Sequence, residues 1–123
     1  MKKISITVLF FVLVIACGCK DKGFKPKHLL NEQEMIAIMA DVQIIEADIN
    51  HQKMEEQDRD PDDTTKTVPK DFAKMSREYY DQLFEHYAIT DSIFEQNMRY
   101  YTEHPEALER IMDSVLQRLT KLR

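Results

Sequence analysis

The sequence predicts an all-α fold, a small bundle of about four helices that follows a short apolar N-terminal segment and contains one long acidic loop. Several stretches repeat apolar residues at steps of three and four, which is typical of amphipathic helices. We find no alternating run of β-branched or aromatic residues bounded by turns, which is the pattern of a strand. Neither glycine lies beyond Gly23, so the remaining chain carries few helix breakers.

The first residues have the pattern of an export signal. Lys2 and Lys3 precede an apolar run over residues 4–16 that is interrupted only by Ser5 and Thr7. This run has the length of a signal-peptide apolar region and is shorter than the roughly 20 residues needed to span a bilayer. A retained membrane helix is therefore the less favoured alternative.

The segment Val14-Ile15-Ala16-Cys17-Gly18-Cys19 ends this run and resembles the lipobox of bacterial lipoproteins. The resemblance implies that a cysteine thiol is diacylated and that the signal is cut directly before it. Cys17 fits better because an aliphatic residue stands three positions before it, and Cys19 is the alternative anchor. A disulfide between the two is disfavoured, because cysteines two residues apart rarely reach disulfide geometry without strain.

These features divide the chain into three parts. Residues 1–16 are the expected lipoprotein signal peptide, or 1–18 if Cys19 is the anchor, and residues 17–30 are the lipidated anchor and its polar tether. Residues 31–123 are the helical domain. No cysteine follows Cys19, which excludes an internal disulfide and a thiolate metal site in that domain.

The charge of the chain is acidic. Without Lys2 and Lys3 the chain has 15 basic and 22 acidic side chains, a net charge of −7. Such a charge argues against binding nucleic acid or anionic lipid head groups through charge.

The first predicted helix begins at Asn31, which forms a capping-box pattern with Glu34. Its apolar stripe consists of Met35, Ile38, Val42, Ile45 and Ile49. Residues 51–70 break the pattern, with one large apolar residue in the first seventeen, and predict a disordered acidic loop.

Three further helices are predicted after the loop. Thr90 is the expected N-cap of the third helix, and Pro105 fits the first turn of the fourth, where its missing N–H costs nothing. The stripes are Phe72, Met75, Tyr79, Leu83 and Tyr87 in the second; Ile93, Phe94, Met98 and Tyr101 in the third; and Leu108, Ile111, Val115, Leu119 and Leu122 in the fourth.

Two segments carry a resemblance to a known family. Leu83-Phe84-x-x-Tyr87-Ala88-Ile89-Thr90, followed by Tyr100-Tyr101 and His104-Pro105-Glu106-x-Leu108, resembles the domain of unknown function 4296 family, small helical lipoproteins of Bacteroidota. The resemblance implies a helical, lipid-anchored protein and supplies no catalytic residues. Ala88 replaces the usual glycine of the family turn, so this turn is expected to close differently. Asn97 stands where a serine is common.

The acidic loop contains a partial match to a calcium site. Asp58, Asp60 and Asp62 match positions one, three and five of an EF-hand loop, but Asp63 occupies the glycine position and Pro69 the bidentate glutamate position. A solvated acidic loop is therefore preferred, and a non-EF cation site remains the alternative.

No catalytic or metal site is predicted elsewhere. The four histidines lack the paired spacing of a metal site, and a chain without glycine after Gly23 has no phosphate-cradling loop. A buried carboxylate pair with a shifted pKa is left open.

The tyrosine doublets are the remaining candidates for a binding surface. Neighbours in a helix point about 100° apart, so one member faces inward while the other faces out. Tyr79 and Tyr101 fit the apolar stripes and are predicted in the core. Tyr80 and Tyr100 are then candidate interface residues, with ordinary packing at the edge of the core as the alternative.

The sequence therefore favours a non-enzymatic, lipid-anchored interaction or accessory subunit of an outer-membrane complex of the cell envelope. The expected location is the outer membrane, facing the periplasm, with surface exposure as the alternative. We expect an envelope protein as partner, no nucleic acid, and no cofactor beyond the covalent lipid. The alternative is a periplasmic small-ligand or peptide-binding lipoprotein with a groove between helices.

Overall fold

The computed structural model describes residues 23–60, 62 and 69–122. This part of the chain forms four helices and contains no strand, which confirms the all-α prediction. The helices are α2 (Glu32–Gln57), α3 (Phe72–His86), α4 (Asp91–Thr102) and α5 (Pro105–Thr120). The predicted signal peptide and both candidate anchors, Cys17 and Cys19, lie outside the described residues.

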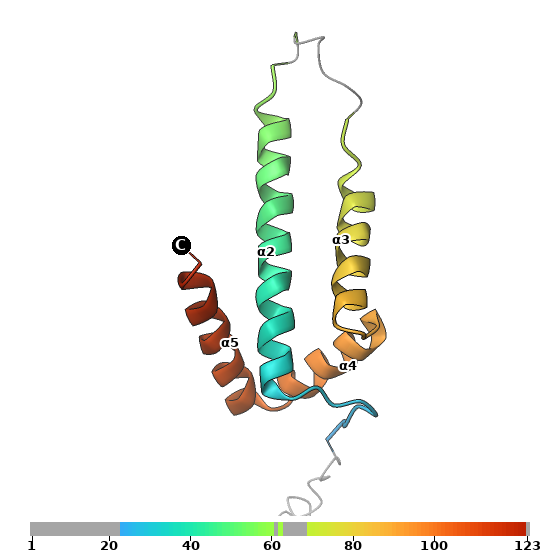
Figure 1. Ribbon diagram of the computed structural model, residues 1–123, viewed down its shortest axis with the longest axis vertical. Helices are drawn as coiled ribbons and strands as arrows, with labels where there is room; N and C mark the ends of the chain where they lie inside the picture. Colours follow the sequence, from blue (N-terminus) through green and yellow to red (C-terminus); the bar gives the residue numbers. More distant parts are fainter. Residues whose placement is uncertain (1–22, 61, 63–68, 123) are drawn as a thin grey trace, which may run out of the picture.

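The helices are arranged around α2, as Figure 1 shows. α3 runs beside one side of α2 and α5 beside the other, and both pack against it. The short α4 crosses at the end of the molecule where α2 begins, and it connects α3 to α5. The chain before α2 leaves at this same end, opposite the connection between α2 and α3.

The predicted helix starts are present. The Asn31 side chain accepts a hydrogen bond from the N–H of Glu34 (3.0 Å), and the Glu34 carboxylate accepts one from the N–H of Asn31 (2.7 Å). Thr90 Oγ1 accepts from the N–H of Ile93 (3.2 Å), and Pro105 occupies the first turn of α5. Capping side chains satisfy the N–H groups that a helix start leaves free, and therefore fix where each helix begins.

α2 is longer than predicted. It continues to Gln57, so the expected loop start at residue 51 is wrong. The added turns are polar, but side-chain pairs support them: Gln52 donates to Asp48 (2.9 Å), one turn earlier, and accepts from Lys70 Nζ (2.9 Å), just before α3. Polar helix turns of this kind lack the apolar periodicity on which the prediction depended.

The main core lies at the end of the molecule where α4 crosses. We call the base the set formed by residues 23–45, α4 and α5. Its hydrophobic core cluster consists of Leu30, Met35, Ile38, Met39, Ala40, Tyr101, Ile111 and Val115. Burying a large apolar side chain contributes about 1.5–3 kcal/mol, so this cluster dominates the stability of the fold.

The other end of the molecule is thinner. We call the arm the pair formed by residues 46–57 of α2 and by α3. Its buried apolar side chains among the described residues are Ile49, Leu83 and Phe84. The arm is therefore a two-helix hairpin with a narrow apolar seam.

The turn after α3 adopts the left-handed conformation that glycine favours. The N–H of Ile89 donates to the carbonyl of Phe84 (3.0 Å) and that of Ala88 to Glu85 (3.0 Å), which is the Schellman pattern. Ala88 has φ of 52°. The expectation that alanine makes this turn close differently is wrong: the turn closes as a glycine turn does, at a conformational cost of about 1–2 kcal/mol.

Candidate interaction surfaces

The chain before α2 is docked onto α4. We call residues 23–30 the strap. Asn97 of α4 is completely buried, and its side chain accepts from the N–H of Leu30 (2.8 Å) and donates to the carbonyls of His28 (2.8 Å) and Ile93 (2.8 Å). A buried amide with all these partners fixes both the strap and the helix, because losing any of them leaves a polar group unpaired.

Further contacts continue along the strap. The Tyr101 hydroxyl donates to the carbonyl of Leu30 (2.6 Å), and the N–H of Phe24 donates to the Glu103 carboxylate (3.1 Å). The Arg99 guanidinium lies 4.4 Å from the centre of the Phe24 ring. The tether predicted over residues 17–30 is therefore not free over residues 23–30, and the folded domain begins at the strap rather than at residue 31.

A signal for the strap was present in the sequence. Asn97 lies within the apolar stripe of α4, between Phe94 and Met98. A buried polar side chain needs hydrogen-bond partners, so this position indicated a backbone segment packed on the stripe. The helix pattern did not indicate which segment of the chain this would be.

Two tyrosines connect the end of α3 to α2. The Tyr80 hydroxyl donates to Glu46 (2.5 Å), and the Tyr87 hydroxyl donates to Asp41 (2.5 Å). Burial, the hydrogen bond and the nearby carboxylate together raise the pKa of each tyrosine to about 12. Both hydroxyls therefore remain protonated donors at neutral pH, and the two carboxylates are used as acceptors within the fold.

Tyr80 and Tyr100, the candidate interface residues, are half-buried in different surroundings. Tyr80 lies in the groove between α3 and α4. Tyr100 stacks on His104 with ring centres 4.0 Å apart, at the turn between α4 and α5. Of their neighbours, Tyr101 is buried as predicted, whereas Tyr79 is half-buried and lines a groove, so its predicted core position is wrong.

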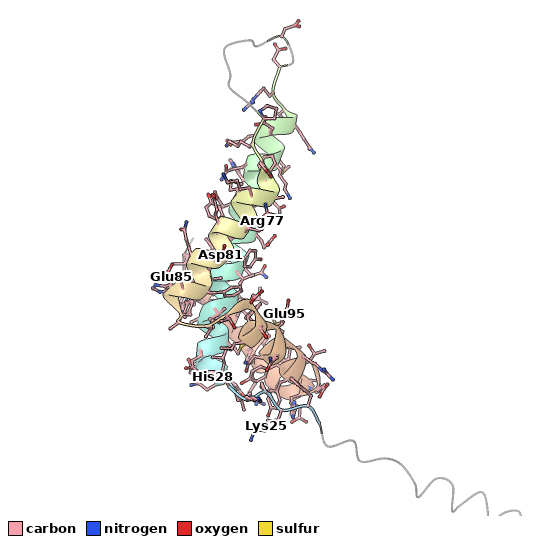
Figure 2. The ribbon with its side chains drawn as sticks, turned by 90° about the vertical axis from the view of Figure 1, so that its right-hand side faces the viewer. Lys25, His28, Arg77, Asp81, Glu85 and Glu95 are labelled. Atoms are coloured by element: carbon pink, nitrogen blue, oxygen red, sulfur yellow. The ribbon has the colours of Figure 1, made fainter. Side chains whose placement is uncertain are left out.

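The groove between α3 and α4 has a volume of about 450 Å³. Tyr80, Phe84 and Phe94 form its aromatic floor, with ring centres 5.9 and 5.5 Å apart. Its rim carries Arg77 and the carboxylates of Asp81, Asp91 and Glu95. Figure 2 shows Arg77 and Asp81 along α3 and Glu95 on α4. The groove therefore combines an aromatic floor, half-buried at Tyr80 and Phe94, with a negative rim.

A second groove of about 380 Å³ lies between α3 and α2. Its lining consists of Ile44, Ile45, Asp48, Tyr79, Gln82, Leu83 and His86. Because neighbouring helix residues point about 100° apart, Tyr79 opens onto this groove while Tyr80 opens onto the other. α3 thus separates an aliphatic groove from an aromatic, acid-rimmed one.

The aspartates of the partial calcium match are used locally. Asp58 caps the end of α2 through its backbone, and the Asp60 carboxylate accepts from the N–H of Asp62 (3.0 Å). Among the described residues, no three His, Cys, Asp or Glu side chains are placed to hold a metal ion. The structure therefore does not bring Asp58, Asp60 and Asp62 together as ligands.

The comparisons with known proteins agree with the family resemblance. None of the described helices combines the length and apolar character that crossing a membrane requires. No curated protein and no solved structure matches the chain. The sequence model of one family, described as Domain of unknown function (DUF4296), matches residues 26–123, a range that begins inside the strap and includes all four helices. The chain belongs to the DUF4296 family.

Proposed function

We propose that the protein is a membrane-anchored, non-enzymatic interaction module of the cell envelope. It docks onto a protein of an outer-membrane complex through the groove between α3 and α4. The observation that carries this proposal is the aromatic floor of the groove, formed by Tyr80, Phe84 and Phe94 beneath an acidic rim.

The composition of the groove supports docking. Aromatic side chains are enriched where protein interfaces gain most of their binding energy. Asp81 and Glu95 are exposed, and within the described part of the chain neither forms an ion pair. Both carboxylates are therefore available to a partner without disturbing the fold.

The rim also suggests the chemistry of the partner. Three carboxylates against the single guanidinium of Arg77 give the groove a negative potential. A lysine or arginine side chain of the partner gains from this potential and from resting on an aromatic ring. A basic segment of an envelope protein is therefore the proposed ligand.

Lipid anchoring adds to the affinity. Acylation at Cys17, or alternatively at Cys19, confines the domain to the membrane surface, which raises its effective concentration near membrane partners. The proposed location is the outer membrane, facing the periplasm. The covalent lipid is the only non-protein group in this proposal.

Site-specific crosslinking in intact cells tests the proposal. A photo-crosslinking amino acid replaces Glu95 on the groove rim, and a matched control replaces Asp113, which is exposed on α5. We expect one defined adduct from position 95, identified by mass spectrometry, and no such adduct from position 113. The same adducts from both positions, or adducts of the protein with itself alone, would contradict docking through this groove.

A charge-removal pair complements the crosslinking. D81N/E95Q removes two rim carboxylates, and E109Q/D113N removes the same number and types from exposed positions on α5. We expect the first pair to reduce the position-95 adduct or its recovery in a native-detergent pulldown, whereas the second leaves both unchanged. Equal losses would show that net charge, and not the groove, attracts the partner.

The groove between α2 and α3 supports a second candidate function. Its lining of Ile44, Ile45, Tyr79 and Leu83 suits a small apolar ligand or peptide side chain. A thermal-shift screen against envelope metabolites and peptides tests it, with I44N as the control that should lose any stabilisation. No shift with any compound would exclude this candidate within the screened set.

A further inference from the structure

The docked strap leaves a short connection between the domain and its anchor. The contacts made by Asn97, Tyr101 and Glu103 fix the chain against α4 from Leu30 back to Phe24. Gly23 lies six positions after Cys17 and four positions after Cys19, the two candidate lipid anchors. A chain extends by at most about 3.6 Å per residue, so the connection reaches no further than about 22 Å or 14 Å.

This reach is short compared with the domain. α2 has 26 residues and is therefore about 39 Å long. The chain enters at the base, and the α2–α3 connection lies at the opposite end of α2 (Figure 1). A free tether over residues 17–30 would have let either end approach the membrane, whereas the docked strap keeps the base beside it.

The charges of the two ends differ. Residues 20–27 carry four lysines and one aspartate, whereas residues 55–71 carry seven acidic and three basic side chains. Near the strap, the carboxylates of Glu32 and Glu103 are paired with Arg110 and Arg99. An anionic membrane surface attracts a basic segment beside it and repels the acidic far end, although the chain as a whole is acidic.

We propose that the strap end of the base contacts an anionic lipid surface, so that the domain stands end-on with the arm directed away from the membrane. Figure 2 shows Lys25 and His28 at this strap end, and Arg77 of α3 further along the molecule. The inference rests on the lipid anchoring of the proposed function and adds an orientation to it. The α2–α3 connection then lies about 39 Å, the length of α2, from the end of the molecule where α2 begins.

Energy transfer in vesicles tests the orientation. The lipidated full chain is reconstituted in vesicles of phosphatidylethanolamine and phosphatidylglycerol that carry an acceptor dye on a lipid. A donor dye is attached through a non-natural amino acid at exposed Glu106, in the first turn of α5, or at exposed Asp62, in the α2–α3 connection. We expect several-fold greater transfer from position 106 than from position 62, and equal transfer would overturn the proposal.

Two insertion variants test whether the short connection to the anchor is what keeps the base beside the membrane. About twelve Gly and Ser residues inserted between Lys22 and Gly23 add about 40 Å of maximum reach and should lower the transfer from position 106. The same insertion between Asp62 and Asp63 should leave it unchanged. An unchanged value with the first insertion would overturn the role of the strap.

The lipid composition tests the charge argument. Replacing phosphatidylglycerol with phosphatidylcholine should raise the transfer from position 62, because the far end is no longer repelled. An unchanged value would overturn the electrostatic part. Intact-mass analysis of the N-terminal peptide separates failure of the lipid anchoring from failure of the orientation. Absence of acyl groups refutes the anchoring. Equal energy transfer from positions 106 and 62 of an acylated chain refutes the orientation alone.

Discussion

The base and the arm are built from the same helix, α2, but they are stabilised in different ways. In the base, α4, α5 and the strap enclose the N-terminal half of α2, and Met35, Ile111 and Asn97 have no exposed surface. In the arm, α2 has α3 as its partner, and Ile49 is the buried residue of its α2 half. α2 is therefore enclosed on several sides over its first half and packed against α3 over its second half.

This difference separates two levels of stability. The base gains from many buried apolar side chains, each worth about 1.5–3 kcal/mol, whereas a tyrosine–carboxylate hydrogen bond of the kind that joins α3 to α2 is worth about 1–3 kcal/mol. The arm is therefore expected to open locally at a lower free energy than global unfolding requires.

The largest effect is expected from removing side chains in the two cores. We expect I111A, in the base, to lower the free energy of unfolding by about 4 kcal/mol, and I49A, in the arm, to lower it by about 2 kcal/mol. The arm loses less because Ile49 lies outside the main core cluster, to which Ile111 belongs. Urea unfolding followed by circular dichroism measures both values. Equal losses would mean that the arm is packed as tightly as the base.

The next effect concerns the strap. N97A removes the partner of the buried Leu30 N–H and of the part-buried His28 carbonyl, and we expect a loss of about 3 kcal/mol. Q96A is the control, because Gln96 is the neighbour that bonds Ser92 on the helix surface, and it should cost less than about 0.5 kcal/mol. Amide exchange should show Leu30 losing protection in N97A, and retained protection would mean that the strap does not depend on this amide.

The contacts that Tyr80 and Tyr87 make with α2 should respond to alkaline pH. The pKa of Tyr80 and of Tyr87 is about 12 in the folded protein, above the usual value of 10, so the folded state favours the protonated hydroxyls. Their contribution to stability is complete below pH 10 and is lost as the pH rises towards 12.

The double variant Y80F/Y87F provides the comparison. It should be less stable than the parent at pH 8 by about 1 kcal/mol for each hydrogen bond. Between pH 10 and 12 the urea midpoint of the variant should fall less than that of the parent, because the variant lacks the two titrating hydroxyls. The lysine titrations are common to both chains and cancel in the comparison. Parallel curves would show that these hydroxyls do not stabilise the fold.

The smallest effect is a gain at the junction between arm and base. Ala88 holds a left-handed backbone angle, so A88G should stabilise the protein by about 0.5–1 kcal/mol. A47G, at an exposed position within α2, should instead destabilise it by about 1 kcal/mol. Thermal unfolding of both variants tests the difference in sign, and a loss in A88G would contradict the conformational argument.

Local signals predicted much of this fold from the sequence. The Asn31 capping box, the Thr90 cap and Pro105 marked helix starts that the structure confirms, because caps depend on residues only a few positions apart. The end of α2 was misplaced because its polar turns are supported by single side-chain pairs and by Lys70, which lies across the connection.

The candidate site was less predictable because it is made by contacts distant in sequence. The bonds between Asn97 and Leu30, and between Tyr80 and Glu46, join residues that no helical period relates. Tyr80 was identified as a surface aromatic, and its contact with Phe84 follows from helical spacing, but the packing of Phe84 against Phe94 depends on how α3 and α4 meet. Helical spacing fixes the face of one helix and leaves open which helix covers it.

Because α2 is one unbroken helix, it is expected to move as a rigid rod that connects the two ends of the molecule. The helix contains neither glycine nor proline between Glu32 and Gln57, so it has no built-in hinge where core and hairpin meet. Over about 39 Å, each degree of rotation at the fulcrum end displaces the far end by about 0.7 Å. A load on the α2–α3 connection is therefore transmitted as torque to the packed end of the same rod.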